Sequence, residues 1–337
     1  MKLRAILIVA AIAAGVLIPL GLSDFMRALA ANAAIAGLLV LSLVLLTGYT
    51  GQISFSQYSF AAVGAFSVGS LMAHGWSFWA AAPLGVVFAA LVGMLVAIPA
   101  LRLSGLFLAI LTVAVALFFD RFLLAPGTWD SFSGGVSPWR PSRPHLFGIG
   151  LDGSYVFYLF TFAVLIGVTL LIWNLRVGKS GRVLRAIRDS EVAAQTIGYD
   201  LTLWKLGAFG LSAAICGVAG ALQAVAIGSV SPPSYDFTHS IQIAAVATVF
   251  GVGSITAAFV GGIFFVFFPE ILRHTPLQAR VFPLILGALL IFQLVFAPEG
   301  AVARWQADIR RVMRKRGMNT RITVDSPTVE PEAAEVA

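Results

Sequence analysis

Residues 28–47 read ALAANAAIAGLLVLSLVLLT, an uninterrupted run of twenty residues without a charged side chain. A membrane hydrocarbon core of about 30 Å is spanned by about 20 apolar helical residues, so this run predicts a membrane-spanning helix. The whole chain has the same character: of its 337 residues, 59% are hydrophobic and 11% are charged, and its mean hydropathy is +0.94. Soluble domains carry about 25% charged residues. The sequence therefore predicts an all-α polytopic membrane protein, since β-barrel strands would alternate in polarity instead.

Hydropathy also predicts where the spans begin and end. The eight clear spans cover residues 5–22, 28–47, 55–73, 78–98, 105–124, 154–174, 206–227 and 281–297. A further apolar stretch is interrupted at Gly251-Val252-Gly253-Ser254. Dividing it into short spans at residues 240–250 and 255–269 gives ten spans. This division places the charged residues 176–205 and the basic run at 304–316 on the same side of the membrane.

The basic residues orient these spans. With ten spans, 16 of the 22 lysines and arginines fall on the side of residues 176–205, which the positive-inside rule assigns to the cytoplasm. We therefore expect a multi-pass protein of the cytoplasmic (inner) membrane with both termini in the cytoplasm. The polar residues 317–337 predict a flexible tail after a membrane domain at residues 1–316. The pI of about 10.0 requires no nucleic acid, because cytoplasmic bases also contact anionic membrane lipid.

Residue types for enzymatic or metal chemistry form no pattern. The lone Cys216 lies within a span and has no disulfide partner, and the four histidines lack metal-ligand spacing. Gly178-Lys179-Ser180 resembles the end of a Walker A loop, but Trp173 occupies the position of the required glycine. The spans also lack the interior carboxylate or histidine that ion-coupled transporters use. We expect no metal, no bound cofactor and no catalytic residue, so that a partner must supply any energy.

One aqueous segment interrupts the apolar chain. Residues 176–205 read RVGKSGRVLRAIRDSEVAAQTIGYDLTLWK and carry six bases and three acids. Residues 182–197 have helical spacing, and Gly198 is a helix-stop residue. The small side chains of Ala193 and Ala194 suit close contact with a groove on a soluble partner. The alternative is a cytoplasmic connector that lipid headgroups hold in place.

Several motifs are similar to those of one transporter family, and they occur along the chain in the same order as in that family. Residues 191–198, EVAAQTIG, resemble the E…AA…G coupling element of ATP-binding cassette (ABC) importer permeases. Residues 48–57, GYTGQISFSQ, are similar to the GY-x-GQ-x-S segment of the branched-chain amino acid permease family, LivM-like branch. Further similar segments are SGLFLAILT at 104–112, VSPP at 230–233, FGVGS at 250–254 and PEG at 298–300. The resemblance covers roughly residues 30–305.

The resemblance implies a fold and a set of partners. The fold is the type II ABC importer permease fold, with about ten transmembrane helices, some of them short or broken. The chain would pair with a second, LivH-like permease, two cytoplasmic ATPase subunits that hold ATP and Mg²⁺, and an extracytoplasmic solute-binding protein. Its expected substrates are branched-chain or other hydrophobic amino acids. The residues expected to couple it to the ATPases are Arg182, Arg185, Arg188, Glu191, Ala193, Ala194 and Gly198.

The substrate pathway is expected along the broken, glycine-rich segments, because irregular backbone at membrane depth is tolerated only against protein or a cavity. The candidate residues are Gly51, Gln52, Ser54, Ser56, Gln57, Ser59, Gly251, Gly253 and Ser254. The alternative for each is that a small or hydroxyl side chain only allows close helix packing. Two departures from the family bear on specificity: Ser56-Gln57 replaces a common Gly-His pair, and Phe250-Gly251 replaces Gly-Gly.

A second function class remains open. An ATP-independent facilitator or channel for a small neutral solute, such as urea or an amide, would share the uncharged pathway. It gives no reason for the coupling-like residues 191–198. The turn-rich residues 125–153 on the outer face either help to dock a binding protein or form an irregular cap over the spans.

Overall fold

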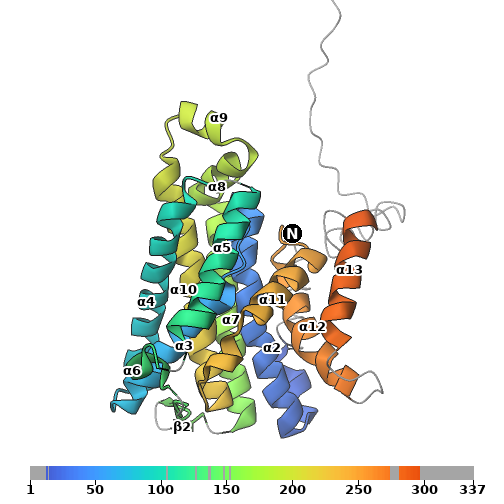
Figure 1. The fold of residues 1–337 in the computed structure, drawn as a ribbon. Helices are drawn as coiled ribbons and strands as arrows, with labels where there is room; N and C mark the ends of the chain where they lie inside the picture. Colours follow the sequence, from blue (N-terminus) through green and yellow to red (C-terminus); the bar gives the residue numbers. More distant parts are fainter. Residues whose placement is uncertain are drawn as a thin grey trace, which may run out of the picture.

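The computed structural model describes residue 13 and residues 15–103, 105–125, 127–135, 138–146, 149–151, 153–273 and 281–296. This part of the chain is almost entirely helical (Figure 1). The helices are η1 (Ile18–Gly21), α2 (Asp24–Leu43), η2 (Val44–Tyr49), α3 (Gln57–Ala73), α4 (Phe78–Ala100), α5 (Leu106–Phe118), η3 (Phe119–Leu123), α6 (Asp130–Ser133), α7 (Ser154–Val177), α8 (Lys179–Asp189), α9 (Glu191–Thr196), α10 (Leu201–Ile227), η4 (Pro232–Tyr235), α11 (Phe237–Phe250), α12 (Thr256–Arg273) and α13 (Phe282–Phe296). Two short strands, β1 (His145–Leu146) and β2 (Ile149–Gly150), pair antiparallel.

The helices bear out the polytopic membrane fold. Six helical segments in the described residues are long and apolar enough to cross a membrane: Asp24–Tyr49, Phe78–Ala100, Leu106–Leu123, Ser154–Val177, Leu201–Ile227 and Thr256–Arg273. The shorter apolar helices α3, α11 and α13 coincide with three further predicted spans. Half of the first predicted span, residues 5–22, falls outside the described residues, so the total of ten stays a prediction. The basic run at 304–316, the PEG motif and the tail at 317–337 also lie outside them.

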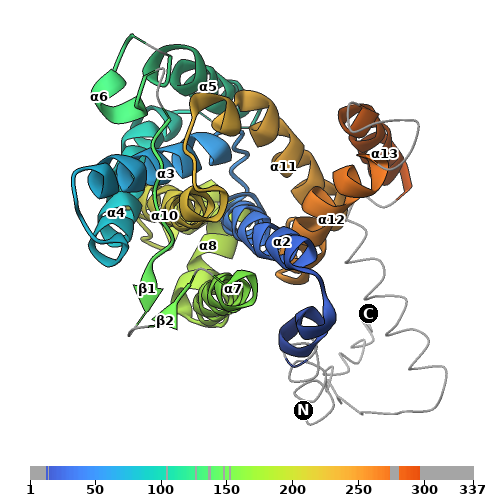
Figure 2. The same ribbon diagram turned by 90° about the horizontal axis from the view of Figure 1, so that it is seen from below.

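Two helices form the centre of the bundle. Figure 2 shows α2 and α10 surrounded by α3, α4, α7, α11 and α12. In α2, Leu38 to Leu41 are at most 1% exposed. The close approach of α10 to α3 depends on small residues, because a Cβ on Gly220 would lie 1.9 Å from the carbonyl oxygen of Ala61. A second such contact joins α12 to α2, where a Cβ on Gly262 would lie 2.4 Å from the carbonyl oxygen of Ala33. These are the small-residue seams typical of helix packing in membranes.

Two of the predicted helix breaks are present. The central helix α2 continues into the π-helix η2, and residues 51–56 are then non-helical before α3 begins at Gln57. The second break separates α11 from α12, and it begins at Gly251, whose φ of +100° disfavours an L side chain. The predicted division of this apolar stretch into two helices is therefore confirmed, but the second of them, α12, is long enough to cross a membrane and is not short.

The two ends of the bundle differ. At one end α8 and α9 project beyond the membrane-length helices, and α6 and the β1–β2 hairpin lie at the other end (Figure 1). The hairpin end is a folded cap rather than an open loop. The backbone N–H of Val230 donates to the carbonyl of Trp139 at 2.8 Å, and the Trp139 indole donates to the carbonyl of Phe132 at 2.9 Å.

Candidate functional site

The charged segment folds into two helices that meet at Ser190. Its backbone is extended there (φ −160°, ψ 111°), and its hydroxyl accepts a hydrogen bond from the N–H of Ala193 at 3.2 Å. Ser190 is thus the N-cap of α9, a role in which serine is favoured over a helix-interior position. The prediction of one continuous helix over residues 182–197 is therefore wrong at Ser190. The predicted stop is confirmed, because Gly198 has φ +95° directly after the end of α9.

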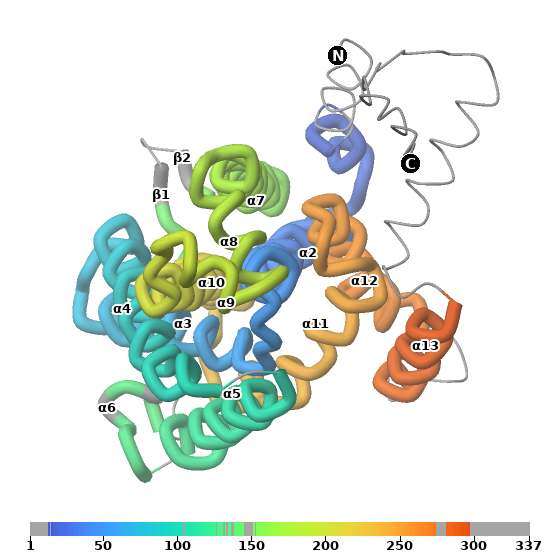
Figure 3. Tube along the Cα trace, turned by 90° about the horizontal axis from the view of Figure 1, so that it is seen from above, coloured from blue at the N-terminus to red at the C-terminus, as the bar shows by residue number. Residues whose placement is uncertain are grey.

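A small hydrophobic cluster holds the two helices together. Val183, Ile187 and Ala194 are each at most 5% exposed, and Leu201 and Trp204 of α10 pack against them. Of the two predicted contact alanines, Ala194 therefore faces inward, whereas Ala193 is exposed. Together, α8 and α9 form a platform over the end of α10, as Figure 3 shows from above. We refer to residues 179–198 as the α8–α9 platform.

An ion pair fixes the platform to the central helix α10. The Glu191 carboxylate lies 2.6 Å from the Lys205 ammonium, and the side chains are 46% and 7% exposed, respectively. A buried ammonium without a partner is costly, so Glu191 compensates a charge that α10 carries into the bundle. Movement of α9 relative to α10 would have to break this pair.

Arg188 joins the platform to the first helix break. Its guanidinium Nη1 donates a hydrogen bond to the carbonyl of Gly48 in η2. Its side-chain stem also lies against Gly51, where an added Cβ would be 3.2 Å from Cγ and 3.8 Å from Cβ of Arg188. Residues that are 140 positions apart in the sequence are thus in direct contact. Arg188, which was predicted to couple the chain to the ATPases, thus contacts the segment that was predicted to line the substrate pathway.

The remaining arginines behave differently. Arg185 Nε donates to the Gly181 carbonyl at 3.0 Å, and its Nη2 donates to the Arg176 carbonyl at 3.4 Å, so it braces the corner between α7 and α8. The Arg176 guanidinium lies over the Tyr49 ring, 5.8 Å from its centroid. Arg182 is exposed on α8. Of the predicted coupling set, Arg182, Ala193 and Gly198 are exposed, and within the described residues no side-chain hydrogen bond or ion pair joins Arg182 to the bundle.

The two predicted pathway segments lie side by side. A Cβ on Gly48 would be 2.0 Å from the carbonyl oxygen of Val252 and 3.0 Å from its carbonyl carbon. Only a glycine permits this approach between η2 and the α11–α12 break. Gly253 next to it is open, with nothing within 4 Å of an added Cβ. Ser254 Oγ lies 2.6 Å from Thr256 Oγ1 at the start of α12.

The polar side chains of the first helix break are buried inside the helix bundle. The predicted pathway residues Gln52, Ser54, Ser56, Gln57 and Ser59 are all at most 6% exposed. Ser54 Oγ and Ser56 Oγ are 3.1 Å apart, and the Phe55 N–H donates to Thr112 Oγ1 at 3.1 Å. These bonds hold the non-helical backbone in place.

Gln57 is the centre of a buried polar cluster that sequence reasoning missed. Its Oε1 accepts from Ser42 Oγ at 3.1 Å and from the Cys216 thiol at 2.8 Å, and Ser212 Oγ donates to the Ser42 carbonyl. Gln57 Nε2 has no hydrogen-bond partner among the described residues. The only sequence signal was an isolated polar residue in each apolar helix, which does not reveal that these helices meet.

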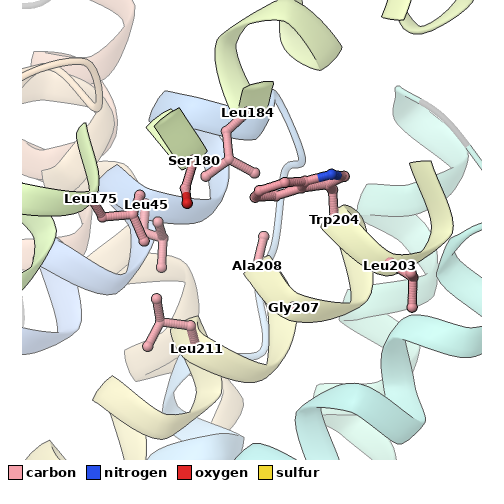
Figure 4. Close-up of a pocket in the computed structure, with 9 residues that line it drawn as sticks. All are labelled: Leu45, Leu175, Ser180, Leu184, Leu203, Trp204, Gly207, Ala208 and Leu211. Atoms are coloured by element: carbon pink, nitrogen blue, oxygen red, sulfur yellow. The ribbon is translucent and has the colours of Figure 1, made fainter. Parts of the chain in front are cut away.

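A cavity of about 430 Å³ lies beneath the platform (Figure 4). Leu184 of α8 and Trp204 of α10 approach it from one side, and Leu211 lies opposite. Gly207 also lines it, and an added Cβ there would meet nothing within 4 Å. The contact between α8 and the bundle is therefore incomplete, which leaves apolar space under the platform.

The described residues contain no group of three or more His, Cys, Asp or Glu side chains that could hold a metal ion. The arrangement instead provides a charged platform, two polar contacts from it into the bundle, and two helix breaks that touch. It can transmit a displacement of the platform to the breaks.

Comparison with known proteins identifies the family. The family model described as the branched-chain amino acid transport system permease component matches residues 25–294. The high-affinity branched-chain amino acid transport system permease protein LivM of Salmonella typhimurium strain LT2 is 30% identical over 288 residues, and so is LivM of Escherichia coli strain K12. Each alignment covers 78% of this chain and 66% of the relative, so the chain spans just under two-thirds of their length. No solved structure matches significantly. The chain belongs to the family of branched-chain amino acid transport system permease components.

Proposed function

We propose that this chain is a permease subunit of an ATP-driven importer of branched-chain or other hydrophobic amino acids. Family membership supports the transport role. The observation that carries the ATP-driven mechanism is the α8–α9 platform, which projects from the bundle and contacts a helix break through Arg188. The platform side of the bundle faces the cytoplasm, in agreement with the positive-inside rule, and both termini lie on that side.

The partners follow from the same proposal. Two cytoplasmic ATPase subunits hold ATP and Mg²⁺, a LivH-like permease completes the membrane pair, and an extracytoplasmic binding protein delivers the solute. The outer surface of α9 suits an ATPase contact, because Val192 and Ile197 are 72% and 71% exposed on an otherwise polar platform. Exposed apolar residues rimmed by polar ones mark interaction surfaces. Sequence reasoning had not selected these two residues.

The contacts suggest how force is transmitted. When the ATPase subunits close, the platform moves as a rigid body, and the apolar cavity beneath α8 gives it room. Arg188 then displaces the Gly48 carbonyl, and Glu191 displaces α10 through Lys205. Because Gly48 also contacts Val252, this displacement changes the distance between the two helix breaks. The pathway opens toward one side and closes toward the other.

The facilitator alternative predicts a different dependence. A facilitator would move a neutral solute without ATP and would not need the outward surface of α9. The decisive measurement is therefore uptake into vesicles with and without internal ATP, together with mass spectrometry of the proteins that co-purify with the chain in mild detergent.

The sharpest variant is Val192→Ser combined with Ile197→Ser. Both side chains are exposed, so the fold should persist, while the ATPase subunit should no longer co-purify and ATP-driven uptake should be lost. Leu284→Ser on α13 is a matched control, because Leu284 is 75% exposed and far from α9 in the fold (Figure 1). Unchanged ATPase recovery from the double variant would argue against the coupling surface. Uptake without ATP would favour the facilitator.

A further inference from the structure

A second cavity, of about 260 Å³, lies where α2, α3, α10, η4, α11 and α12 converge. It is separate from the cavity under the platform, since none of the lining residues is shared. Its walls include the middle of α2 and the last turns of α10, the end of α10 that lies toward the hairpin (Figure 1). Drug-sized ligands occupy pockets of about 300–1,000 Å³, so this volume suits a smaller solute.

One side of the cavity is polar and incompletely satisfied. Asn32, Gln223, Ser234 and His239 contribute to the lining. Gln223 Oε1 and His239 Nδ1 are buried atoms without a hydrogen-bond partner among the described residues. An unsatisfied buried polar atom costs about 1–3 kcal/mol, so two of them on residues that line one cavity indicate a ligand that supplies partners.

The rest of the lining is aromatic and apolar and adjoins the polar residues. Tyr58 lines the cavity between His239, at a ring-centroid distance of 5.3 Å, and Phe265, at 6.4 Å. None of the lining residues is Asp, Glu, Lys or Arg. Beside them, burial raises the pKa of the Tyr235 hydroxyl above its usual value, so this group is neutral as well. The cavity therefore offers no fixed charge to balance a net charge on a ligand.

The cavity also touches the first helix break. Tyr58 is the second residue of α3, the helix that begins directly after the non-helical residues 51–56. Its backbone N–H donates to Ser240 Oγ at 3.1 Å, which ties the start of α3 to α11. Any ligand against Tyr58 therefore contacts the helix that continues from the break that Arg188 holds.

We propose that this cavity is a solute-binding site for a small molecule without net charge that has a polar end and a short apolar side chain. The polar end faces Gln223, His239 and Asn32, which together offer donors and acceptors to a zwitterion. The apolar side chain lies against Tyr58 and Phe265. This inference rests on the proposed transport function and adds to it a site within this subunit.

The test measures binding of radiolabelled leucine to the assembled permease complex in lipid nanodiscs, without the solute-binding protein. Gln223→Met keeps the side-chain length and removes the polar atoms, and His239→Phe keeps a planar ring. Each should weaken leucine binding at least tenfold. Gln242→Met is the matched control, because Gln242 lies on α11 but does not line the cavity. It should bind leucine like the unmodified complex.

Thermal unfolding and basal ATPase activity of each variant show whether the complex is intact. Leucine binding should be displaced by isoleucine or valine and not by lysine or glutamate. Unchanged affinity in both intact variants, or displacement by the charged amino acids, would overturn the proposed site. If a variant does not assemble, binding is measured in Ala36→Val instead, which narrows the cavity. This variant should weaken isoleucine binding more than alanine binding. Equal loss of affinity for the two amino acids would overturn the proposed site.

The outcome for this site is separate from that for the proposed function. Failure of the site would leave ATP-driven uptake by the unmodified complex intact. Failure of the proposed function would instead abolish the ATP dependence of uptake in every variant, including the unmodified chain.

Discussion

The contact between Gly48 and Val252 makes a quantitative prediction for Gly48→Ala. The added Cβ would lie 2.0 Å from the Val252 carbonyl oxygen, whereas ordinary van der Waals contact begins at 3.4 Å. The two helix breaks must therefore separate by about 1.4 Å, the difference between these distances. Overpacking of this kind costs about 1–3 kcal/mol in stability. Because Arg188 binds the carbonyl of the same Gly48, the displacement also weakens the link to the platform.

Two measurements together test this reasoning: the Tm of the purified chain and ATP-driven uptake by the reconstituted complex. Gly48→Ala should lower the Tm moderately and reduce uptake far more than stability alone explains. Gly253→Ala should leave the Tm unchanged, because nothing lies within 4 Å of its Cβ. Gly262→Ala introduces a similar clash, 2.4 Å from the Ala33 carbonyl, in a packing seam away from the breaks.

The comparison with Gly262→Ala decides the interpretation. If both variants lose uptake in proportion to their Tm, the effect of Gly48→Ala is one of stability only. If Gly48→Ala has unchanged Tm and uptake, the two breaks do not meet as described, and the reasoning is refuted.

Three further predictions concern the platform. Arg188→Met removes the hydrogen-bond donor to the Gly48 carbonyl, so uptake should fall at least tenfold while ATPase activity is kept. The control is Lys179→Met, at an exposed position of α8, which should show the uptake of the unmodified chain. Glu191→Ala should lower the free energy of unfolding by about 1–3 kcal/mol, because it leaves the Lys205 ammonium buried and unpaired. Lys205→Met should cost less, since the Glu191 side chain is 46% exposed and can be hydrated. Equal losses in chemical unfolding would contradict this asymmetry. Gly207→Ala should raise the free energy of unfolding by up to about 1 kcal/mol, because alanine has the higher helix propensity. Gly207→Phe should fill the cavity under the platform and slow uptake. A Gly207→Phe variant with full uptake would show that the platform does not move into this cavity.

Much of the fold was predictable because membrane spans follow from length and hydropathy. The helix breaks at residues 51–56 and at Gly251 were also predictable, since glycine and serine interrupt the apolar runs there. The turn at Ser190 was not predicted, although a serine directly before Glu191 is a pattern typical of a helix start. Helical spacing of apolar residues continued across it, and this spacing outweighed the capping pattern in the prediction.

The arrangement of the site was less predictable. The residues of the platform and of the breaks were selected from local motifs, but no local pattern indicates that Arg188 reaches Gly48 or that Gly48 meets Val252. The same holds for the bond between Cys216 and Gln57, because the sequence indicated only that Cys216 lies within a span and has no disulfide partner. Such contacts depend on the packing of distant helices. The cavity next to Tyr58 combines side chains from six helices, and so it has no contiguous sequence signature.

The central claim is that the contact between Arg188 and the first helix break transmits the platform's movement. Disulfide rescue tests it most directly. A Cβ on Gly51 would lie 3.8 Å from Cβ of Arg188, within the range of about 3.5–4.5 Å found in disulfides. Because Gly51 has φ +72°, which disfavours an L side chain, Gly51→Cys alone is the control and must keep its uptake. In the double variant Gly51→Cys, Arg188→Cys, the reduced complex should hydrolyse ATP with little uptake, and oxidation should restore uptake by replacing the lost tether. Full uptake in the reduced state, or no recovery in a complex with the disulfide verified by mass spectrometry, would contradict the claim.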